Sequence, residues 1–267
     1  MFFYMMQALY QGYNGYTGTS LYESWSLTVL NTLFTSLCVI ILGIFEQDLS
    51  ADTLLAVPEL YGYGQRNEAL NIPKYLLWML GATIEGIVVW FVCWAAYTYG
   101  IPKDDNMFAL GDLCFSLGIV WTNFKLFVLD THHKNLMVLF SISITVGGWW
   151  AWNAFLSSAY GKGAPGGYYV RGGFVGKFGT DPVWWLTLLL VFGVLFVMEV
   201  AYRAVKMRLI RAGRWHVRFW RIESGDDGKW RLELWQEMER DAGVRERLRA
   251  MARGETVNEM DDGNDTE

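Results

Sequence analysis

Polar side chains that interrupt the apolar stretches of this chain are its candidate functional groups. One uncharged stretch, Trp25 to Phe45, contains the carboxamide of Asn31 and the hydroxyls of Thr35 and Ser36. In a helix a hydroxyl can bond back to the carbonyl one turn earlier. A carboxamide keeps unused donors and acceptors and needs a partner or water. Asn31 is therefore the residue of this stretch best suited to contact a polar ligand or a neighbouring helix.

Charged residues also fall inside other apolar stretches. Glu85 lies within residues 75–99, and Asp112 and Lys125 lie within residues 107–129. A carboxylate at the middle of a bilayer costs about 3 kcal/mol to insert. Each surrounding Leu, Ile, Val or Phe favours insertion by about 0.3–0.6 kcal/mol, so the stretch as a whole still inserts. Glu85 is then either protonated and packed against a neighbouring helix, or a polar site along a substrate path.

The remaining charges lie near the ends of their stretches. Asp112 and Lys125 are thirteen residues apart, which is roughly 20 Å along a helix and too far for them to pair. Lys125 is expected to extend its ammonium toward cytosolic headgroups. Glu199 and Arg203 stand four residues apart and are expected to pair at the inner end of the last apolar stretch. Glu85 and Asp112 remain possible polar sites within the membrane.

Metal and phosphate chemistry find little support in the sequence. All three cysteines lie in apolar stretches, which favours packing: Cys38, Cys93 and Cys114. His132 and His133 are adjacent, which is poor spacing for two metal ligands on one helix, so no metal site is expected. The glycines of residues 158–181 follow no strand-to-helix pattern, so a phosphate-binding loop is not predicted. No cofactor is expected in this chain.

The composition is that of a membrane protein. Of the 267 residues, 53% are hydrophobic and 16% aromatic, whereas only 18% are charged, a composition that soluble domains rarely have. The predicted fold class is an all-α transmembrane helical bundle with five full spans and an N-terminal partial span. The membrane domain is placed at residues 25–206, with spans at about 25–45, 75–99, 107–129, 135–156 and 182–201.

The segments outside the spans differ in character. Residues 1–24 begin with an apolar run of about half the length of a span and continue into a polar turn. Residues 46–73 are acidic, and Ser50 predicts a short capped helix that Pro58 ends. Asp181, followed by a proline, likewise predicts a capped start for the last span.

The tail after the spans, residues 207–253, is predicted to be small and cytosolic. Apolar residues alternate around a Ser-Gly-Asp-Asp-Gly turn at residues 215–234 and predict a β-hairpin. Residues 237–253 show the periodicity of an amphipathic helix. Residues 254–267 are acidic and are expected to be disordered.

Charged and aromatic residues define the expected orientation. Seven basic residues close to the last span place that end in the cytosol: Arg203, Lys206, Arg208, Arg211, Arg214, Arg218 and Arg221. This basic cluster is suited to hold anionic lipid headgroups, at about 1 kcal/mol per residue near the surface. Six tryptophans are expected to form an aromatic belt at the outer interface: Trp90, Trp94, Trp149, Trp150, Trp184 and Trp185.

Residues 27–71 contain an ordered series of uncommon residues. They read L-x-x-L-N-T-L-F-T-S-L, then L-G-I-F-E-Q-D, and then P-E-L-Y-x-x-G-Q-R-N-E-x-x-N. This series closely resembles the phospholipid-translocating branch of the P-type ATPases, the lipid flippases. Less specific matches extend the resemblance over nearly all of residues 1–210, including Asn14 to Gly18, Leu110 to Asp112 with Lys125, and Glu199 with Tyr202 and Arg203.

The resemblance implies the end of the family's fifth span and its sixth to tenth spans. The family has an asparagine at the position of Asn31, so Asn31 is the implied contact for a lipid headgroup. Phe34, Thr35 and Ser36 are further candidates. A packing role for Asn31, bonded to a neighbouring span, remains the alternative. The chain departs from the family at Cys38, where proline is usual, so a straighter span is expected.

In the family this membrane region is driven by an ATP-dependent motor. The chain contains no D-K-T-G-T, T-G-E, D-G-E-T or G-D-G-x-N-D motif. ATP and magnesium are therefore expected to bind domains outside these residues, and the chain alone is not expected to couple ATP to transport. The family also implies a glycosylated accessory subunit at the outer turns, and a location in Golgi or endosomal membranes or in the plasma membrane.

Two hypotheses follow from these residues. The first is that the chain is the C-terminal membrane region, as a fragment or truncated form, of a phospholipid-translocating ATPase, and contributes to the lipid path and its supporting helices. The second is a free-standing, non-enzymatic membrane protein that binds or regulates a complete flippase. An independent channel or carrier is less favoured, because no repeated half or pair of broken helices is apparent.

Overall fold

A computed structural model describes most of the membrane region and parts of the tail. The described residues are 1–30, 34, 36–47, 49–61, 71–131, 136–161, 170–211, 235–236, 239 and 242–253. Every regular element within them is a helix, which confirms the expected all-helical class at that level. The chain divides into two compact units, Met1–Phe45 with Leu77–Arg208 and Glu46–Leu76 with Leu209–Glu267, and each is described by itself.

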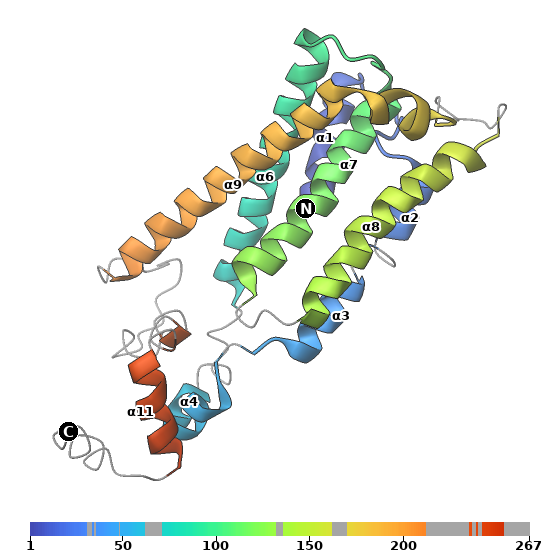
Figure 1. The fold of residues 1–267 in the computed structure, drawn as a ribbon. Helices are drawn as coiled ribbons and strands as arrows, with labels where there is room; N and C mark the ends of the chain where they lie inside the picture. The colour runs from blue at the N-terminus through green and yellow to red at the C-terminus, as the bar shows by residue number, and fades with distance from the viewer. Residues whose placement is uncertain are drawn as a thin grey trace. The chain divides into compact units, whose positions relative to one another are not determined.

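Four long apolar helices dominate the first unit (Figure 1). They are α6 (Ile72–Tyr99), α7 (Met107–Phe124), α8 (Leu136–Ala159) and α9 (Pro182–Arg211). Each is long and apolar enough to cross a membrane when α7 is counted with the π-helical turn η3 (Lys125–Asp130) that continues it. These helices confirm a multi-pass membrane protein. The last helix runs beyond the predicted end of its span because residues 202–211 are mostly good helix formers without a breaker.

The expected span at residues 25–45 consists of two shorter helices. They are α2 (Ser24–Val29) and α3 (Ser36–Phe45). Between them Leu30 and Phe34 have π-type winding, and residues 31–33 and 35 lie outside the described residues. Four of the five expected spans are therefore present as single long helices, and the fifth is described only in its two parts on either side of residues 31–35 and at Phe34 between them.

The N-terminal helix α1 (Phe2–Tyr13) packs against α6 and α7. Two glycines permit this close approach, and Figure 1 shows α1 beside α6 and α7. A Cβ atom at Gly86 of α6 would lie 2.9 Å from the carbonyl oxygen of Phe2, and one at Gly118 of α7 would lie 2.4 Å from the Phe3 ring. Side chains at these positions would push α1 away. The short apolar run at the start of the chain is thus part of the helical core.

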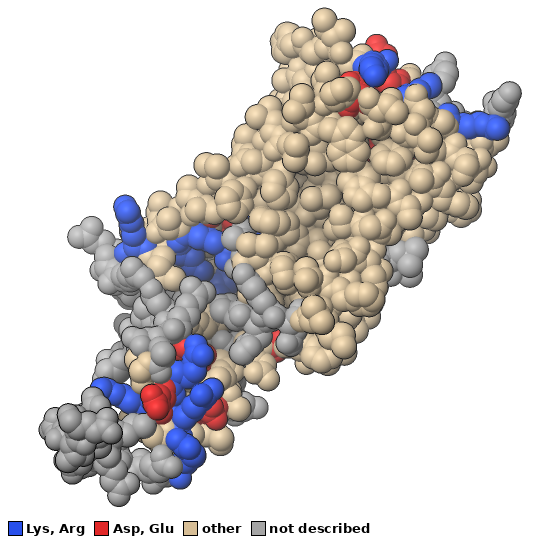
Figure 2. All heavy atoms as spheres, viewed as in Figure 1, with Lys and Arg blue, Asp and Glu red and all other residues tan. Residues whose placement is uncertain are grey.

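The surface of the first unit is suited to lipid. Figure 2 shows a broad face of the bundle without Lys, Arg, Asp or Glu side chains. Large apolar residues stand exposed along α9: Leu186, Leu189, Leu190 and Val197. An exposed apolar face of this kind is typical of helices that contact hydrocarbon.

The expected tryptophan belt is only partly present. Trp90, Trp149 and Trp184 are each 1% exposed, so the prediction that they anchor the bundle at the interface is wrong. Aromatic rings from neighbouring segments cover these tryptophans. Trp184, for example, lies between Phe178 and Trp150, with ring centroids 5.6 and 6.2 Å away. These indoles contribute to helix packing instead.

The loop before α9 is compact where it is described. It contains the turns η4 (Gly173–Lys177) and η5 (Phe178–Thr180). Asp181 follows, and its carboxylate accepts from the backbone N–H of Val183 at 3.0 Å, as the predicted cap requires. Its second oxygen accepts from the N–H of Lys103 at 2.8 Å and thereby joins the loop before α9 to the loop between α6 and α7.

The second unit is built on a contact between two segments far apart in the sequence. They are α4 (Ala51–Ala56), followed by the turn η2 (Pro58–Tyr61), and α11 (Ala242–Ala252). The two helices lie within the predicted segments, and α4 has the predicted Ser50 cap. The predicted hairpin at residues 215–234 lies outside the described residues.

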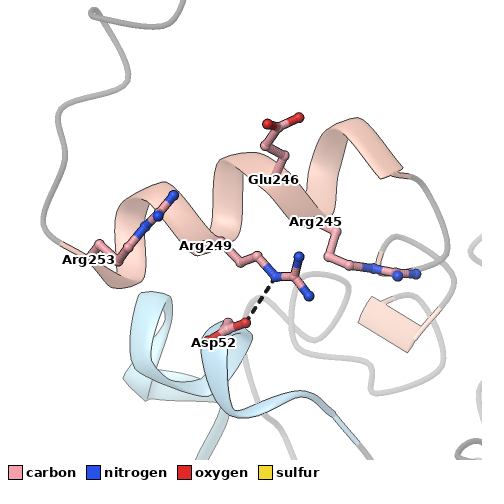
Figure 3. Close-up of a pocket in the computed structure, with 5 residues that line it drawn as sticks. All are labelled: Asp52, Arg245, Glu246, Arg249 and Arg253. Carbon is pink, nitrogen blue, oxygen red and sulfur yellow. Dashed lines mark hydrogen bonds and ion pairs between the residues drawn. The ribbon is translucent and has the colours of Figure 1, made fainter.

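Glu239 joins these two segments through its carboxylate. Its Oε1 accepts from the N–H and the hydroxyl of Ser50, each at 3.0 Å, and from the hydroxyl of Thr53. Arg249 of α11 donates to Asp52 of α4 at 3.2 Å, at the edge of a pocket lined by arginines (Figure 3). Because the Glu239 carboxylate lies at the N-terminus of α4, it also complements the dipole of that helix.

Replacement of Glu239 by Ala is expected to loosen α4. Charge-assisted hydrogen bonds of this kind contribute about 1.5–3 kcal/mol, so amide exchange in residues 51–56 should become at least about tenfold faster. Hydrogen exchange read by mass spectrometry in detergent micelles measures this. The matched control is Glu246→Ala, because Glu246 points away from α4 (Figure 3). Equal exchange rates in the two variants would show that Glu239 does not hold α4.

Candidate functional site

A cluster of four charged residues joins three helices inside the first unit. The four-charge cluster consists of Glu85 on α6, Lys125 at the end of α7, and Glu199 and Arg203 on α9. The Lys125 ammonium lies 2.6 Å from Glu85 Oε1 and 3.0 Å from Glu199 Oε2. One lysine thus bridges two carboxylates from different helices.

The other carboxylate oxygens of the cluster are also paired. The Trp121 indole N–H donates to Glu85 Oε2 at 3.2 Å, and Arg203 Nε donates to Glu199 Oε1 at 2.7 Å. Two acids face two bases, so the cluster is electrically balanced. Both glutamate side chains are only 8% exposed. Buried charges are tolerable when they are paired and fully hydrogen-bonded, and this cluster meets that condition.

This geometry changes two expectations from the sequence. Lys125 does not extend freely to headgroups, because Glu85 and Glu199 hold its ammonium. Glu85 does not only pack against a neighbouring helix, because its carboxylate oxygens accept from the Lys125 ammonium and the Trp121 indole. The distance from Lys125 to its partners is short because α6, α7 and α9 converge there. We conclude that the cluster fastens these helices together.

A second set of contacts runs between the α2–α3 segment and α8. Four residues of the segment meet four residues of α8 and its C-terminal end, in antiparallel order. We call this set the α8 ladder. Its pairs are Glu23 with Tyr160 (2.5 Å), Ser26 with Trp152 (3.1 Å), Phe34 with Trp149 (ring centroids 5.3 Å) and Cys38 with Thr145 (3.2 Å). The ladder holds the segment along most of its length.

The Glu23 end of the ladder is built on the cap of α2. The Glu23 carboxylate accepts from the backbone N–H groups of Trp25 and Ser26, as an N-cap does. It also accepts from the Tyr160 hydroxyl at 2.5 Å. Burial, and then the neighbouring Glu23 carboxylate, raise the pKa of Tyr160 well above its usual value. The phenol therefore remains a donor through neutral and mildly alkaline pH.

The other end of the ladder depends on Cys38. Its thiol donates to the Asn123 side-chain oxygen on α7 at 3.1 Å and lies 3.2 Å from the Thr145 hydroxyl on α8. Asn123 in turn donates to the carbonyl of Ile119 at 2.8 Å. Cys38 thereby joins α3 to α7 and α8 at one point.

The predicted site residues fall into three groups. Phe34 is buried against Trp149, and Ser36 is half-buried at the start of α3, while Asn31 and Thr35 lie outside the described residues. The structure brings Glu85 together with the pair Glu199 and Arg203. Asp112 does not join that cluster.

Asp112 lies in a separate polar pocket of the α7–α8 interface. It is buried, with Asn153 and Ser116 as polar neighbours. Its Oδ2 and both polar atoms of Asn153 nevertheless make no hydrogen bond of acceptable geometry within the described residues. Within the described residues Asp112 makes no ion pair, so its role as a polar site in the membrane stays a prediction.

Sequence reasoning missed several residues that organise the site. Lys125 was read as a surface anchor, Trp149 as part of a belt, and the ladder partners Tyr160 and Thr145 were not considered. Only the spacing of Trp121 and Lys125, one helical turn apart, is a local signal that the two share a face. Their partners come from other helices, which the periodicity of one helix does not reveal.

The fold and site define a multi-pass helical membrane protein whose spans are fastened by internal polar contacts. The family model described as "Phospholipid-translocating P-type ATPase C-terminal" matches residues 1–212. The chain therefore belongs to this family.

Individual relatives agree with this assignment. The chain is 41% identical over 208 residues to "Phospholipid-transporting ATPase dnf1" of Schizosaccharomyces pombe, which covers 78% of this chain and 13% of that protein. It is 33% identical over 207 residues to "Probable phospholipid-transporting ATPase DNF3" of Saccharomyces cerevisiae, and the match covers 78% of this chain and 12% of that protein. It is 27% identical over 214 residues to human "Phospholipid-transporting ATPase IC", and the match covers 78% of this chain and 17% of that protein. The chain thus spans a small part of the length of these relatives.

Replacement of Lys125 by Met is expected to destabilise the membrane unit. Removal of one partner from a buried ion pair costs about 3–5 kcal/mol, because the remaining charges are left unpaired. Thermal unfolding of the full chain in detergent micelles, followed by near-ultraviolet circular dichroism, measures the loss.

Two further variants make this test specific. Glu85→Gln, introduced together with Lys125→Met, should restore part of the stability, because Glu199 then stays paired with Arg203 and no charge of the cluster is left unpaired. Lys103→Met is the control, since its ammonium makes an exposed bond of 3.4 Å to Thr180. A Lys125→Met variant as stable as this control would refute the role of the four-charge cluster.

Proposed function

We propose that this chain acts as the C-terminal membrane region of a phospholipid-transporting P-type ATPase. In this proposal it contributes the α2–α3 segment to the lipid path and the remaining helices to its support. The observation that carries the proposal is the α8 ladder, which holds the segment on α8 from Glu23 to Cys38. The four-charge cluster supports it by keeping α6, α7 and α9 together.

The headgroup contacts are assigned to residues 31–36 of this segment. Asn31 supplies a carboxamide whose donors and acceptors a helix cannot fully satisfy, and Thr35 and Ser36 supply hydroxyls. Leu30 and Phe34 have π-type winding, a feature frequent at functional sites of helices. Phe34 lies in the same stretch but is 4% exposed, so its contribution is to hold the stretch in place.

The energy for transport comes from outside these residues in this proposal. ATP and magnesium bind domains of the longer protein, and their cycle moves the spans against one another. The alternative, a non-enzymatic protein that regulates a separate transporter, gains no support from the described residues or the relatives.

The orientation and partners extend the same proposal. The protein lies in an endomembrane or in the plasma membrane, and the basic end of α9 faces the cytosol. The outer loops, including the compact turn before α9, face the opposite side and offer a surface to a glycosylated accessory subunit. Anionic lipids bind the basic residues at the end of α9 and in the tail, where α11 adds three arginines at one pocket (Figure 3).

Asn31→Ala should change lipid dependence in a transport assay. The host is a chimera in which residues 1–212 replace the matched segment of the S. pombe relative. Loss of a headgroup contact should raise the lipid concentration for half-maximal ATP hydrolysis by about tenfold, equivalent to about 1.4 kcal/mol. The assay compares phosphatidylserine, phosphatidylethanolamine and phosphatidylcholine in detergent micelles.

Thr28→Ala is the matched control for this assay. Its hydroxyl is already bonded to the carbonyl of Ser24 at 3.0 Å, so its loss should leave lipid dependence unchanged. An inactive chimera whose parent relative is active would count against the proposed function. Unchanged lipid dependence in an active Asn31→Ala chimera would count against this lipid path.

Arg208→Gln with Arg211→Gln should weaken the response to anionic lipid. Each basic residue contributes about 1 kcal/mol near a charged surface. The increase in thermal midpoint on adding phosphatidylserine to phosphatidylcholine nanodiscs should therefore fall clearly, and more so at low salt. The outer-loop double variant Lys103→Gln with Arg171→Gln is the control. An undiminished response in the Arg208 and Arg211 variant would contradict this role of the tail.

A further inference from the structure

One side chain, Trp149 of α8, joins three helical segments of the membrane unit. It is 1% exposed, and its indole N–H donates to the Ser116 hydroxyl of α7 at 2.8 Å. Its ring stacks on Phe115 of α7, with centroids 4.7 Å apart and planes at 22°. Phe34 meets the same ring edge-on, with centroids 5.3 Å apart and planes at 89°. Trp149 therefore lies between the α2–α3 segment and α7.

These contacts leave the indole little orientational freedom. A buried indole N–H needs an acceptor, and Ser116, itself fully buried, supplies one. With the N–H directed at Ser116 and one face on Phe115, the plane of the ring is fixed. Edge-to-face contact is a favoured geometry for two aromatic rings, so a fixed Trp149 ring also fixes Phe34.

A polar pair, Asp112 and Asn153, lies close to this contact. Asp112 lies one helical turn before Ser116 on α7, and Asn153 lies one turn after Trp149 on α8. Asp112 Oδ2 and both polar atoms of Asn153 make no hydrogen bond within the described residues. At this level of the α7–α8 interface the Trp149–Ser116 bond is thus the described polar link. Helices in a membrane depend on such bonds and on close packing, because lipid provides no hydrophobic drive between them.

We propose that Trp149 is a positioning residue for the lipid path, and that it sets the place of Phe34 and of the stretch around it. This inference rests on the proposed function. Trp149 is too deeply buried to touch a lipid itself. Phe34 is three residues from Asn31, so a displaced Phe34 moves the stretch that contains the candidate headgroup residue. Loss of the Trp149 contacts should therefore alter lipid recognition without removing any lipid contact.

The native Cys38 provides a direct readout of the segment's position. It lies one helical turn after Phe34 and is 3% exposed. In a background with Cys93→Ala and Cys114→Ala, the full chain in micelles is labelled with N-ethylmaleimide. Trp149→Leu should raise the labelling rate of Cys38 about tenfold by allowing the segment to open locally.

Trp184→Leu is the matched control. Trp184 is equally buried and also donates its indole N–H, to the Ala109 carbonyl at 3.2 Å, but it belongs to α9. Its loss should lower thermal stability to a similar degree and leave Cys38 protected. Faster labelling of Cys38 to the same extent in both variants, at matched stability, would show general loosening and overturn the proposal.

The second readout is lipid dependence in the S. pombe chimera. Trp149→Phe removes the N–H together with part of the ring, and Ser116→Ala removes the acceptor, so both should raise the half-maximal lipid concentration, and Trp149→Phe should raise it at least as much as Ser116→Ala. The double variant should show no further increase, because one bond is lost in all three. Trp184→Leu should leave this concentration unchanged.

The outcomes separate this proposal from the function on which it rests. A shift with Asn31→Ala but none with the Trp149 and Ser116 variants would overturn the positioning role and leave the lipid path intact. No shift with either Asn31→Ala or the Trp149 variants would refute the path assignment, and the positioning role with it. Effects that add in the double variant would show that Trp149 and Ser116 act separately, which the proposal forbids.

Discussion

The structure depends on one constraint, which is that polar groups inside a bilayer must find partners within the protein. Water is absent there, and an unpaired charge is far more costly than in a soluble core. The four-charge cluster meets this constraint by giving every carboxylate oxygen a donor. These donors and acceptors come from α6, α7 and α9. Each charge therefore keeps its partner only while the three helices stay together.

The two sets of polar contacts differ in the energy needed to separate them. Parting Lys125 from Glu85 and Glu199 would leave charges unpaired at low dielectric. The ladder pairs at Ser26, Phe34 and Cys38 are neutral, and neutral contacts between membrane helices are worth about 0.6 kcal/mol on average. Ion pairs therefore hold α6, α7 and α9 together strongly. Several weaker contacts hold the α2–α3 segment, and each of them can be broken separately.

The sequence predicts those features that depend on local properties. The lengths of apolar stretches located α6, α7, α8 and α9, and the four-residue spacing of Glu199 and Arg203 indicated a pair that shares a helix face. The partners of Lys125 lie 40 and 74 residues away along the chain. No periodicity within one helix specifies such distant pairs. The same limit explains Trp149, whose residue type suggested a place at the membrane interface and whose burial results from Phe34 and from α7.

Cys38 shows how a single position can combine local and distant requirements. The family usually has proline there, and proline would remove a backbone donor and bend the helix. Cysteine keeps the helical backbone of α3 and adds a small thiol that reaches both Asn123 and Thr145. A larger side chain would not fit at a buried point where three helices meet. The segment is therefore located at Cys38 by direct contact with α7 and α8, and at Phe34, one helical turn earlier, by contact with Trp149.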